Sequence, residues 1–318
     1  MLLEFKLNFD KCPDKEKCRE LLRIGLKGEN ENAGQCFNAA LTGGSDFSVC
    51  PVPADAEALL IKQKETHKGN VVREIRKAEQ SGFYSHFLNY FNYIPDIVDI
   101  NRSKTTRGGK EIRYFYSCPE RYFGPRAERN YSIEETCAGH YISYFGVFTR
   151  TPGRKLGRIN VDEKLLGYIR VFRLNDLVWY NMIQGHGDYL DLFVMHKMHF
   201  DLIKHYMAMD PPPKYLVYGI ARDDKRQLWK RKALFEPGRI KFDDLDQYYT
   251  AFKEEERRSL TKQAAQYLHN GRFMLSEAVF KMLRSYPDKT LRARCRRGLN
   301  RLIRKITPPF SGKTDPIV

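Results

Sequence analysis

The sequence predicts an α/β fold, a central mixed sheet flanked by helices, with an extension before it and a basic helical region after it. Segments 165–172 and 177–183 have strand-like apolar patterns and meet at Asn175-Asp176, residues that favour a tight turn. A helical pattern then leads to another strand at 214–219. Because a strand, helix, strand connection usually joins parallel neighbours, these segments indicate one mixed sheet.

The first 69 residues are interpreted as an N-terminal extension of the sheet domain. Apolar and polar residues alternate over 3–9, which predicts a strand, and a helical pattern follows over 14–26. Residues 27–52 are rich in Gly, Asn and Ser, which predicts turns. The residues of this extension indicate no particular role.

The other elements of the sheet domain, residues 70–245, follow from periodicity. Aromatic residues recur at helical spacing over 83–100, which predicts a helix that pauses at Pro95. The run 140–148 has an apolar interior and predicts a strand. Further predictions are a strand or helix start at 71–78, helices at 190–207 and 223–234, and a closing edge strand at 237–242.

The chain carries a formal charge of +16, and most of this excess lies near its end. Residues 251–318 hold 16 basic and 6 acidic residues, a net +10. Three interpretations of this C-terminal region, residues 246–318, remain open: a grip on RNA phosphates, contact with an anionic membrane surface, or a solvated helix face. The candidate phosphate contacts lie around an apolar stripe and are Arg292, Arg296, Arg297, Arg301 and Arg304.

The seven cysteines are scattered and include no Cys-x-x-Cys pair, so neither a disulfide framework nor a zinc ribbon is indicated. Cys12 and Cys18, together with Cys36 and Cys50, could ligate zinc, but their spacing favours free buried thiols and no metal is expected. No apolar run approaches the roughly 18 residues that span a bilayer, and charges interrupt the N-terminal residues, unlike a signal peptide. A cytoplasmic protein is therefore expected.

The loop between the second hairpin strand and the next helix is a candidate anion site. It contains Gln184, Gly185, Gly187 and Tyr189 and lies where a helix N-terminus presents backbone N–H groups. A phosphate of a cofactor or substrate is the anion that such a loop would bind.

The order of elements over 70–245 resembles the GNAT acyltransferase fold, a superfamily that includes the Fem-type aminoacyl transferases. Residues 167–169 are similar to the family's central strand, 177–183 to the strand beside the thioester, and 228–237 to its late helix and the turn that follows. The resemblance implies an acyl-CoA donor and an amine acceptor. It also implies that the loop 184–189 holds the coenzyme A pyrophosphate, although its glycines have a shifted spacing.

Acyl transfer of this kind needs a base for the acceptor amine and an acid for the leaving group. His186 is the candidate base, with Asp188 as its partner, and Tyr218 is a candidate acid on the next strand. The alternative is structural, with Asp188 as a helix cap, His186 as a turn residue and Tyr218 in the core. His196 and His199 are interpreted as buried helix histidines rather than as a metal pair.

Three hypotheses for function follow. The first is a GNAT-like N-acyltransferase that moves an acyl group from acyl-CoA to an amine. The second is an aminoacyl-tRNA-dependent transferase, which the basic C-terminal region favours. The third is a non-catalytic GNAT-like module that binds a nucleic acid or a protein, which the shifted glycines of the loop favour.

Overall fold

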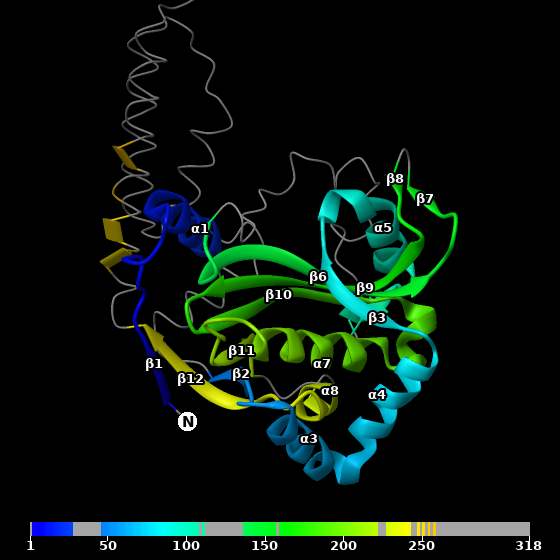
Figure 1. Ribbon diagram of the computed structural model, residues 1–318. Coiled ribbons are helices and arrows are strands. Elements are labelled where there is room, and N and C mark those ends of the chain that lie inside the picture. The colour runs from blue at the N-terminus through cyan, green and yellow to red at the C-terminus, as the bar shows by residue number, and fades with distance from the viewer. Residues whose placement is uncertain are drawn as a thin grey trace, which may run out of the picture. The chain divides into compact units, whose positions relative to one another are not determined.

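The computed structural model describes residues 2–27, 46–107, 110–111, 136–156, 159–221, 227–242, 247–248, 250–251, 254 and 257–258. The chain divides into two compact units, residues 1–252 and 253–318. Every element named below belongs to the first unit (Figure 1).

A mixed sheet of eight strands forms the centre of this unit, in the order β1-β12-β2-β11-β10-β9-β6-β3. The pairs β1–β12 and β10–β11 are parallel, and the other neighbours are antiparallel. This confirms the predicted α/β class and is consistent with a GNAT-like fold. The strands are β1 (Leu2–Phe5), β2 (Asp46–Pro51), β3 (Tyr84–Leu88), β6 (His140–Arg150), β9 (Glu163–Leu174), β10 (Leu177–Gly185), β11 (Tyr215–Ile220) and β12 (Glu236–Phe242).

Helices cover both faces of the sheet (Figure 1). One face packs against α1 and α5, and the other against α3, α4, α7 and α8. The α-helices are α1 (Lys15–Lys27), α3 (Ala56–Glu65), α4 (Asn70–Gln80), α5 (Ile94–Arg102), α7 (Val194–Met207) and α8 (Gln227–Lys232). Three 3₁₀ helices are η1 (Thr66–Gly69), η2 (Tyr90–Tyr93) and η4 (Gly187–Leu192), and two short ribbons join β4 (Thr106–Arg107) to β5 (Lys110–Glu111) and β7 (Lys155–Leu156) to β8 (Ile159–Asn160).

The central strand β9 shows why its sequence is almost continuously apolar. Its Leu166 and Ile169 lie in the core beneath α7, whereas Leu165 and Tyr168 lie in the core beneath α5. A strand that is covered on both faces has no solvent side on which polar residues would alternate with apolar ones. The predicted hairpin is also confirmed, because Leu174 pairs with Leu177 across the turn.

The residues interpreted as an N-terminal extension contribute two strands to the sheet. β2 lies between β11 and β12, and β1 adds in parallel to the far side of β12. The prediction that 237–242 closes the sheet as an edge strand was therefore wrong, since β12 has a neighbour on each side. Strand pairing of this kind joins segments that are distant in the chain, so the local pattern of apolar residues does not predict which strands are neighbours.

The single helix predicted over 83–100 was also wrong. These residues form β3, then η2, then α5, with Pro95 in the first turn of α5 rather than at a pause. Some of the aromatic residues at helical spacing belong to a strand instead. Phe87 of β3 pairs with Phe145 of β6, and the centroids of their rings lie 5.1 Å apart. Proline is favoured in a first helical turn because its missing N–H is not needed there.

The helix predicted over 190–207 is divided in two. The 3₁₀ helix η4 comes first, and Phe193 then adopts a positive φ of 61° before α7 begins. Positive φ is uncommon for a bulky residue, so the packing around Phe193 must hold this bend. The bend brings the first turn of α7 back over the end of β10.

Candidate functional site

The parallel strands β10 and β11 separate part of the way along their length. Their pairing joins Leu177 to Tyr215, Val178 to Leu216 and Trp179 to Val217, and it ends there. β10 nevertheless continues to Gly185 and β11 to Ile220. A register shift between Tyr180 and Met182, where β10 pairs with β9, marks the point of separation on the other side of the strand. Bulges of this kind bend a strand away from its neighbour.

Gly219 of β11 has a backbone conformation that favours glycine. Its φ is +59°, and a Cβ atom added there would meet no atom of the described residues within 4 Å. Beyond Trp179 and Val217 the two strands continue without further pairing to each other in the described residues. We refer to this region as the β10–β11 gap.

The backbone N–H groups of the loop after β10 already have protein acceptors. The N–H of His186 donates to the Leu166 carbonyl at 2.7 Å, and that of Gly187 donates to Ser103 Oγ at 2.7 Å. The N–H of Asp188 donates to His186 Nδ1 at 3.3 Å, and that of Tyr189 donates to the His186 carbonyl at 3.1 Å. An anion at this loop would have to compete with these four bonds.

The two glycines of the loop are needed for contacts within the protein. A Cβ atom on Gly185 would lie 2.3 Å from Met195 Sδ, and one on Gly187 would lie 2.7 Å from the Ser103 carbonyl oxygen. Gln184 and Gly185 are the last residues of β10 and pair with Tyr168 and Gly167 of β9. Glycine here allows the close approach of other parts of the chain.

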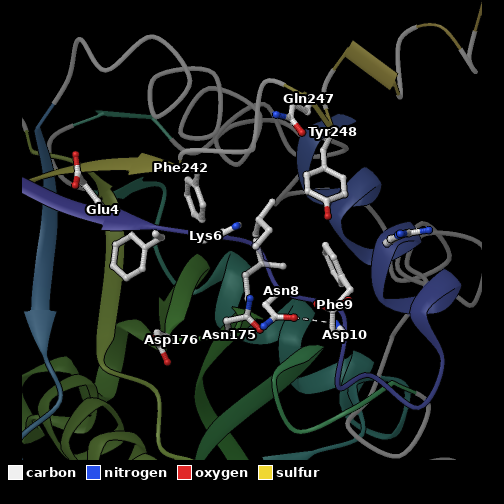
Figure 2. Close-up of a pocket in the computed structure, with 14 residues that line it drawn as sticks. Glu4, Lys6, Asn8, Phe9, Asp10, Asn175, Asp176, Phe242, Gln247 and Tyr248 are labelled. Atoms are coloured by element: carbon white, nitrogen blue, oxygen red, sulfur yellow. Dashed lines mark hydrogen bonds between the residues drawn. The ribbon is translucent and has the colours of Figure 1, made fainter.

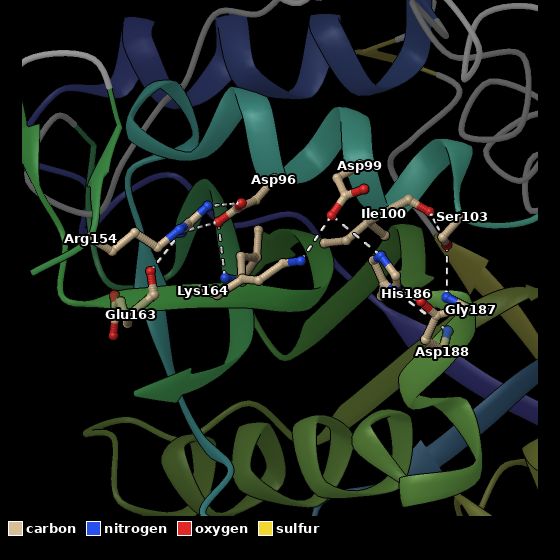
Figure 3. Close-up of polar contacts among 11 residues, drawn as sticks. Asp96, Asp99, Ile100, Ser103, Arg154, Glu163, Lys164, His186, Gly187 and Asp188 are labelled. Atoms are coloured by element: carbon tan, nitrogen blue, oxygen red, sulfur yellow. Dashed lines mark hydrogen bonds and ion pairs between the residues drawn. The ribbon is translucent and has the colours of Figure 1, made fainter. Parts of the chain in front are cut away.

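His186 is a buried cap rather than an exposed turn residue. Only 6% of it is exposed, and its Nδ1 accepts the Asp188 N–H, so His186 is the N-cap of η4. Its Nε2 lies 3.4 Å from Asp99 Oδ2, an oxygen that also pairs with Lys164 Nζ at 3.0 Å (Figure 3). Asp188, which was considered as the cap, has an 81% exposed side chain with Oδ2 3.8 Å from His186 Nδ1.

Tyr218 lies in a different environment from His186. It follows the last residue of β11 that pairs with β10 and packs, partly buried, in the core beneath α7. Its ring is 6.2 Å from that of Tyr180 and 5.8 Å from that of Trp229, and Lys230 Nζ lies 5.3 Å from its centroid. The structure thus brings His186 and Asp188 together on the loop and places Tyr218 beside the β10–β11 gap.

Two buried histidines lie next to this aromatic group. His199 Nδ1 is 3.0 Å from Tyr180 Oη and its Nε2 is 2.8 Å from the Ala233 carbonyl, and burial lowers the pKa of His199 to about 3. His196 Nδ1 is 2.8 Å from Glu74 Oε2, and Lys232 Nζ pairs with the same carboxylate. The Glu74–His196 pair was not predicted from the sequence, because Glu74 belongs to α4 and nothing in its local sequence marks it.

A separate cavity lies at the other end of β10, beside the Asn175-Asp176 turn (Figure 2). Its volume is about 900 Å³, and its walls come from β1 and the segment after it, from the turn, and from the chain after β12. Its lining includes Lys6, Asp10 and Asp176, so it is polar. None of the predicted site residues lines this cavity.

The five arginines predicted to contact nucleic acid, Arg292, Arg296, Arg297, Arg301 and Arg304, lie outside the described residues. Of the helices that the structure describes, none combines the length and apolar character required to cross a membrane. The described part of the chain therefore leaves all three interpretations of the C-terminal region open.

Three solved structures are similar to parts of this chain. FemX has a TM-score of 0.39 and 13% identity over 60% of this chain and 59% of its own. The C-terminal domain of a putative lysylphosphatidylglycerol synthetase from Agrobacterium fabrum has a TM-score of 0.32 and 10% identity, covering 70% and 72%. A tandem GNAT protein from the clavulanic acid biosynthesis pathway has a TM-score of 0.28 and 17% identity, covering 50% and 43%.

The likeness to these structures concerns the fold alone. The match spans less than two thirds of the FemX chain. No protein-family model matches this chain, and no curated protein sequence does.

Proposed function

We propose that this protein transfers an acyl group from an activated donor to an amine, with the donor bound in the β10–β11 gap. The observation that carries the proposal is the end of parallel pairing at Trp179 and Val217, while both strands continue. An exposed strand edge can pair with the amide groups of an extended ligand as an added strand would. A backbone N–H on that edge can also polarise the carbonyl under attack.

Tyr218 is the proposed acid for the leaving group, because it is the first residue of β11 beyond its last pair with β10. His186 is the proposed base, with Asp188 as its partner. Since Nε2 of His186 faces Asp99, an acceptor amine would have to replace Asp99 at that nitrogen before proton transfer. Removing His186 or Tyr218 is expected to lower the transfer rate by about a hundredfold.

Acyl-CoA is the first candidate donor, with Gln184, Gly185, Gly187 and Tyr189 as its proposed contacts. The engaged loop amides favour a second candidate, an aminoacyl-tRNA, because a pyrophosphate would have to break existing bonds of Gly187 and Asp188. The charge of +16 supports the same candidate, since RNA binding draws on basic residues.

The test is donor binding followed by single-turnover acyl transfer. Acetyl-CoA is measured by calorimetry up to about 1 mM, the upper range of enzyme KM values. Charged tRNA is measured by filter binding at two salt concentrations, since RNA affinity should fall steeply with salt. Binding of either donor supports the proposal and identifies the donor class, and binding of neither contradicts it.

Variants then test the gap itself. Tyr218→Phe should slow transfer and leave donor affinity unchanged, whereas Tyr215→Phe should change neither. Tyr215 is the matched control because it lies on the same strand but packs against Phe5 in the core beneath α1. Equal effects of the two substitutions would contradict the role of Tyr218.

A further inference from the structure

Three cysteines and one histidine converge at the start of β6. Cys12 lies in the segment between β1 and α1, and Cys18 lies in α1. Cys137 and His140 stand on one tight turn, in which the His140 N–H donates to the Cys137 carbonyl at 3.1 Å. One sulfur or nitrogen atom from each of the four residues lies within 4.8 Å of all the others.

The distances between these atoms suit one tetrahedral ion. Cys137 Sγ is 3.7 Å from Cys18 Sγ and 3.8 Å from Cys12 Sγ. Two thiolates bound to one zinc ion, each at about 2.3 Å, would lie about 3.8 Å apart. His140 Nδ1 is 3.3 Å from Cys12 Sγ and 3.2 Å from Cys137 Sγ. A disulfide would instead need sulfur atoms about 2.05 Å apart.

The surroundings of His140 hold its ring toward the sulfur atoms. The ring is 1% exposed and stacks on Phe9 at 4.8 Å. Its Nε2 lies 3.1 Å from the side-chain amide of Asn175, which can offer either a donor or an acceptor. An outer partner on the second ring nitrogen is what metal-binding histidines usually have.

The three thiols of the cluster differ in how much they are exposed to solvent. Cys18 is fully buried, whereas Cys12 and Cys137 are partly exposed.

We propose that Cys12, Cys18, Cys137 and His140 bind one zinc ion that joins the N-terminal segment to β6. Three sulfur ligands and one nitrogen ligand around a single point suit zinc, and four protein ligands leave no open position for a substrate. The site is therefore structural. It links residues up to 128 positions apart in the chain and does not depend on the proposed acyl transfer.

The experiment compares zinc content in purified full-length protein by mass spectrometry, without chelators. The wild type should hold about one zinc ion per chain. Cys137→Ser should hold less than about a tenth of that amount, whereas Cys50→Ser should match the wild type. Cys50 is the control because it too is a free cysteine, but it is buried on β2 and lies outside the cluster.

X-ray absorption at the zinc edge of the wild type decides the ligand set, even if Cys137→Ser fails to fold. Three sulfur neighbours and one nitrogen neighbour support the proposal. A protein without zinc, iron in its place, fewer than three sulfur ligands, or equal zinc loss in the two variants would overturn it.

Discussion

The polar groups at the two ends of β10 differ in their partners: those after β10 are bonded within the chain, whereas those before it border a cavity. After β10, the N–H groups of 186–189 are bonded within the chain, and Gly185 and Gly187 admit only neighbouring protein atoms. Before β10, the Asn175-Asp176 turn borders a polar cavity, and Asn175 lies against His140 of the sulfur cluster. A glycine-containing loop that looks suited to an anion can therefore be saturated by its own protein. A turn without any such signal can adjoin the groups that suit a metal.

Removing zinc would distinguish the two ends most strongly. On the zinc proposal, a strong chelator should lower the free energy of unfolding by about 3 kcal/mol or more, because structural zinc binding contributes directly to folding. Hydrogen exchange should become faster in residues 2–27 and 136–142 and stay unchanged in 184–207. Equally faster exchange at both ends would contradict a local role for the metal.

Acid should destabilise the end that follows β10 through His199. The pKa of His199 is about 3 in the folded protein, against an ordinary value of 6.5. Below pH 6.5 the unfolded chain therefore binds a proton at His199 that the folded protein does not bind, and this favours unfolding. This contribution to stability is fully present above pH 6.5 and is lost as pH falls toward 3. Between pH 6.5 and pH 5 the loss should be about 2 kcal/mol.

Urea unfolding at a series of pH values measures this effect. The pH slope should become shallower in His199→Gln, which keeps polar groups facing Tyr180 and the Ala233 carbonyl. An unchanged slope in that variant would assign the acid sensitivity to other groups.

A methyl group tests how tightly each end is packed. Gly185→Ala should destabilise the fold by about 1–3 kcal/mol, because the added Cβ would overlap Met195 and Leu190. Gly139→Ala, at the other end, should change stability by less than about 0.5 kcal/mol, since its Cβ would meet its nearest neighbour at 3.6 Å. Urea unfolding of both variants measures the difference, and equal losses would contradict the contrast in packing.

The smallest expected effect concerns the cap after β10. His186→Ala should cost about 1 kcal/mol, because the Asp188 N–H loses its acceptor. Asp188→Ala should cost less than about 0.5 kcal/mol, since its side chain is 81% exposed. Thermal unfolding can rank the two variants, and a larger loss for Asp188→Ala would show that Asp188 is the true cap.

Prediction from sequence succeeded where the signal was local. The hairpin around Asn175 followed from strand-like patterns and a turn dipeptide, and Asn175 does adopt a positive φ of 49°, which asparagine tolerates. It failed for 83–100, where one aromatic spacing fits both a helix and a strand, and only pairing with β6 decided between them. For the candidate site, the loop does follow the second hairpin strand as predicted, but the hydrogen-bond partners of its N–H groups, Ser103 and Leu166, are distant in sequence.

The sequence by itself determined the α/β class and the hairpin next to a parallel strand, because apolar periodicity and turn residues act over a few positions. The tertiary structure decided which backbone N–H groups of the loop are bonded within the protein and which thiols lie close together. The possible zinc ligands named from the sequence were Cys12 and Cys18 with Cys36 and Cys50, yet Cys50 lies elsewhere in the core and Cys36 is outside the described residues. The partners of Cys12 are Cys18, Cys137 and His140. Contacts across more than a hundred residues depend on the packing of α1 against β6, which no local pattern encodes.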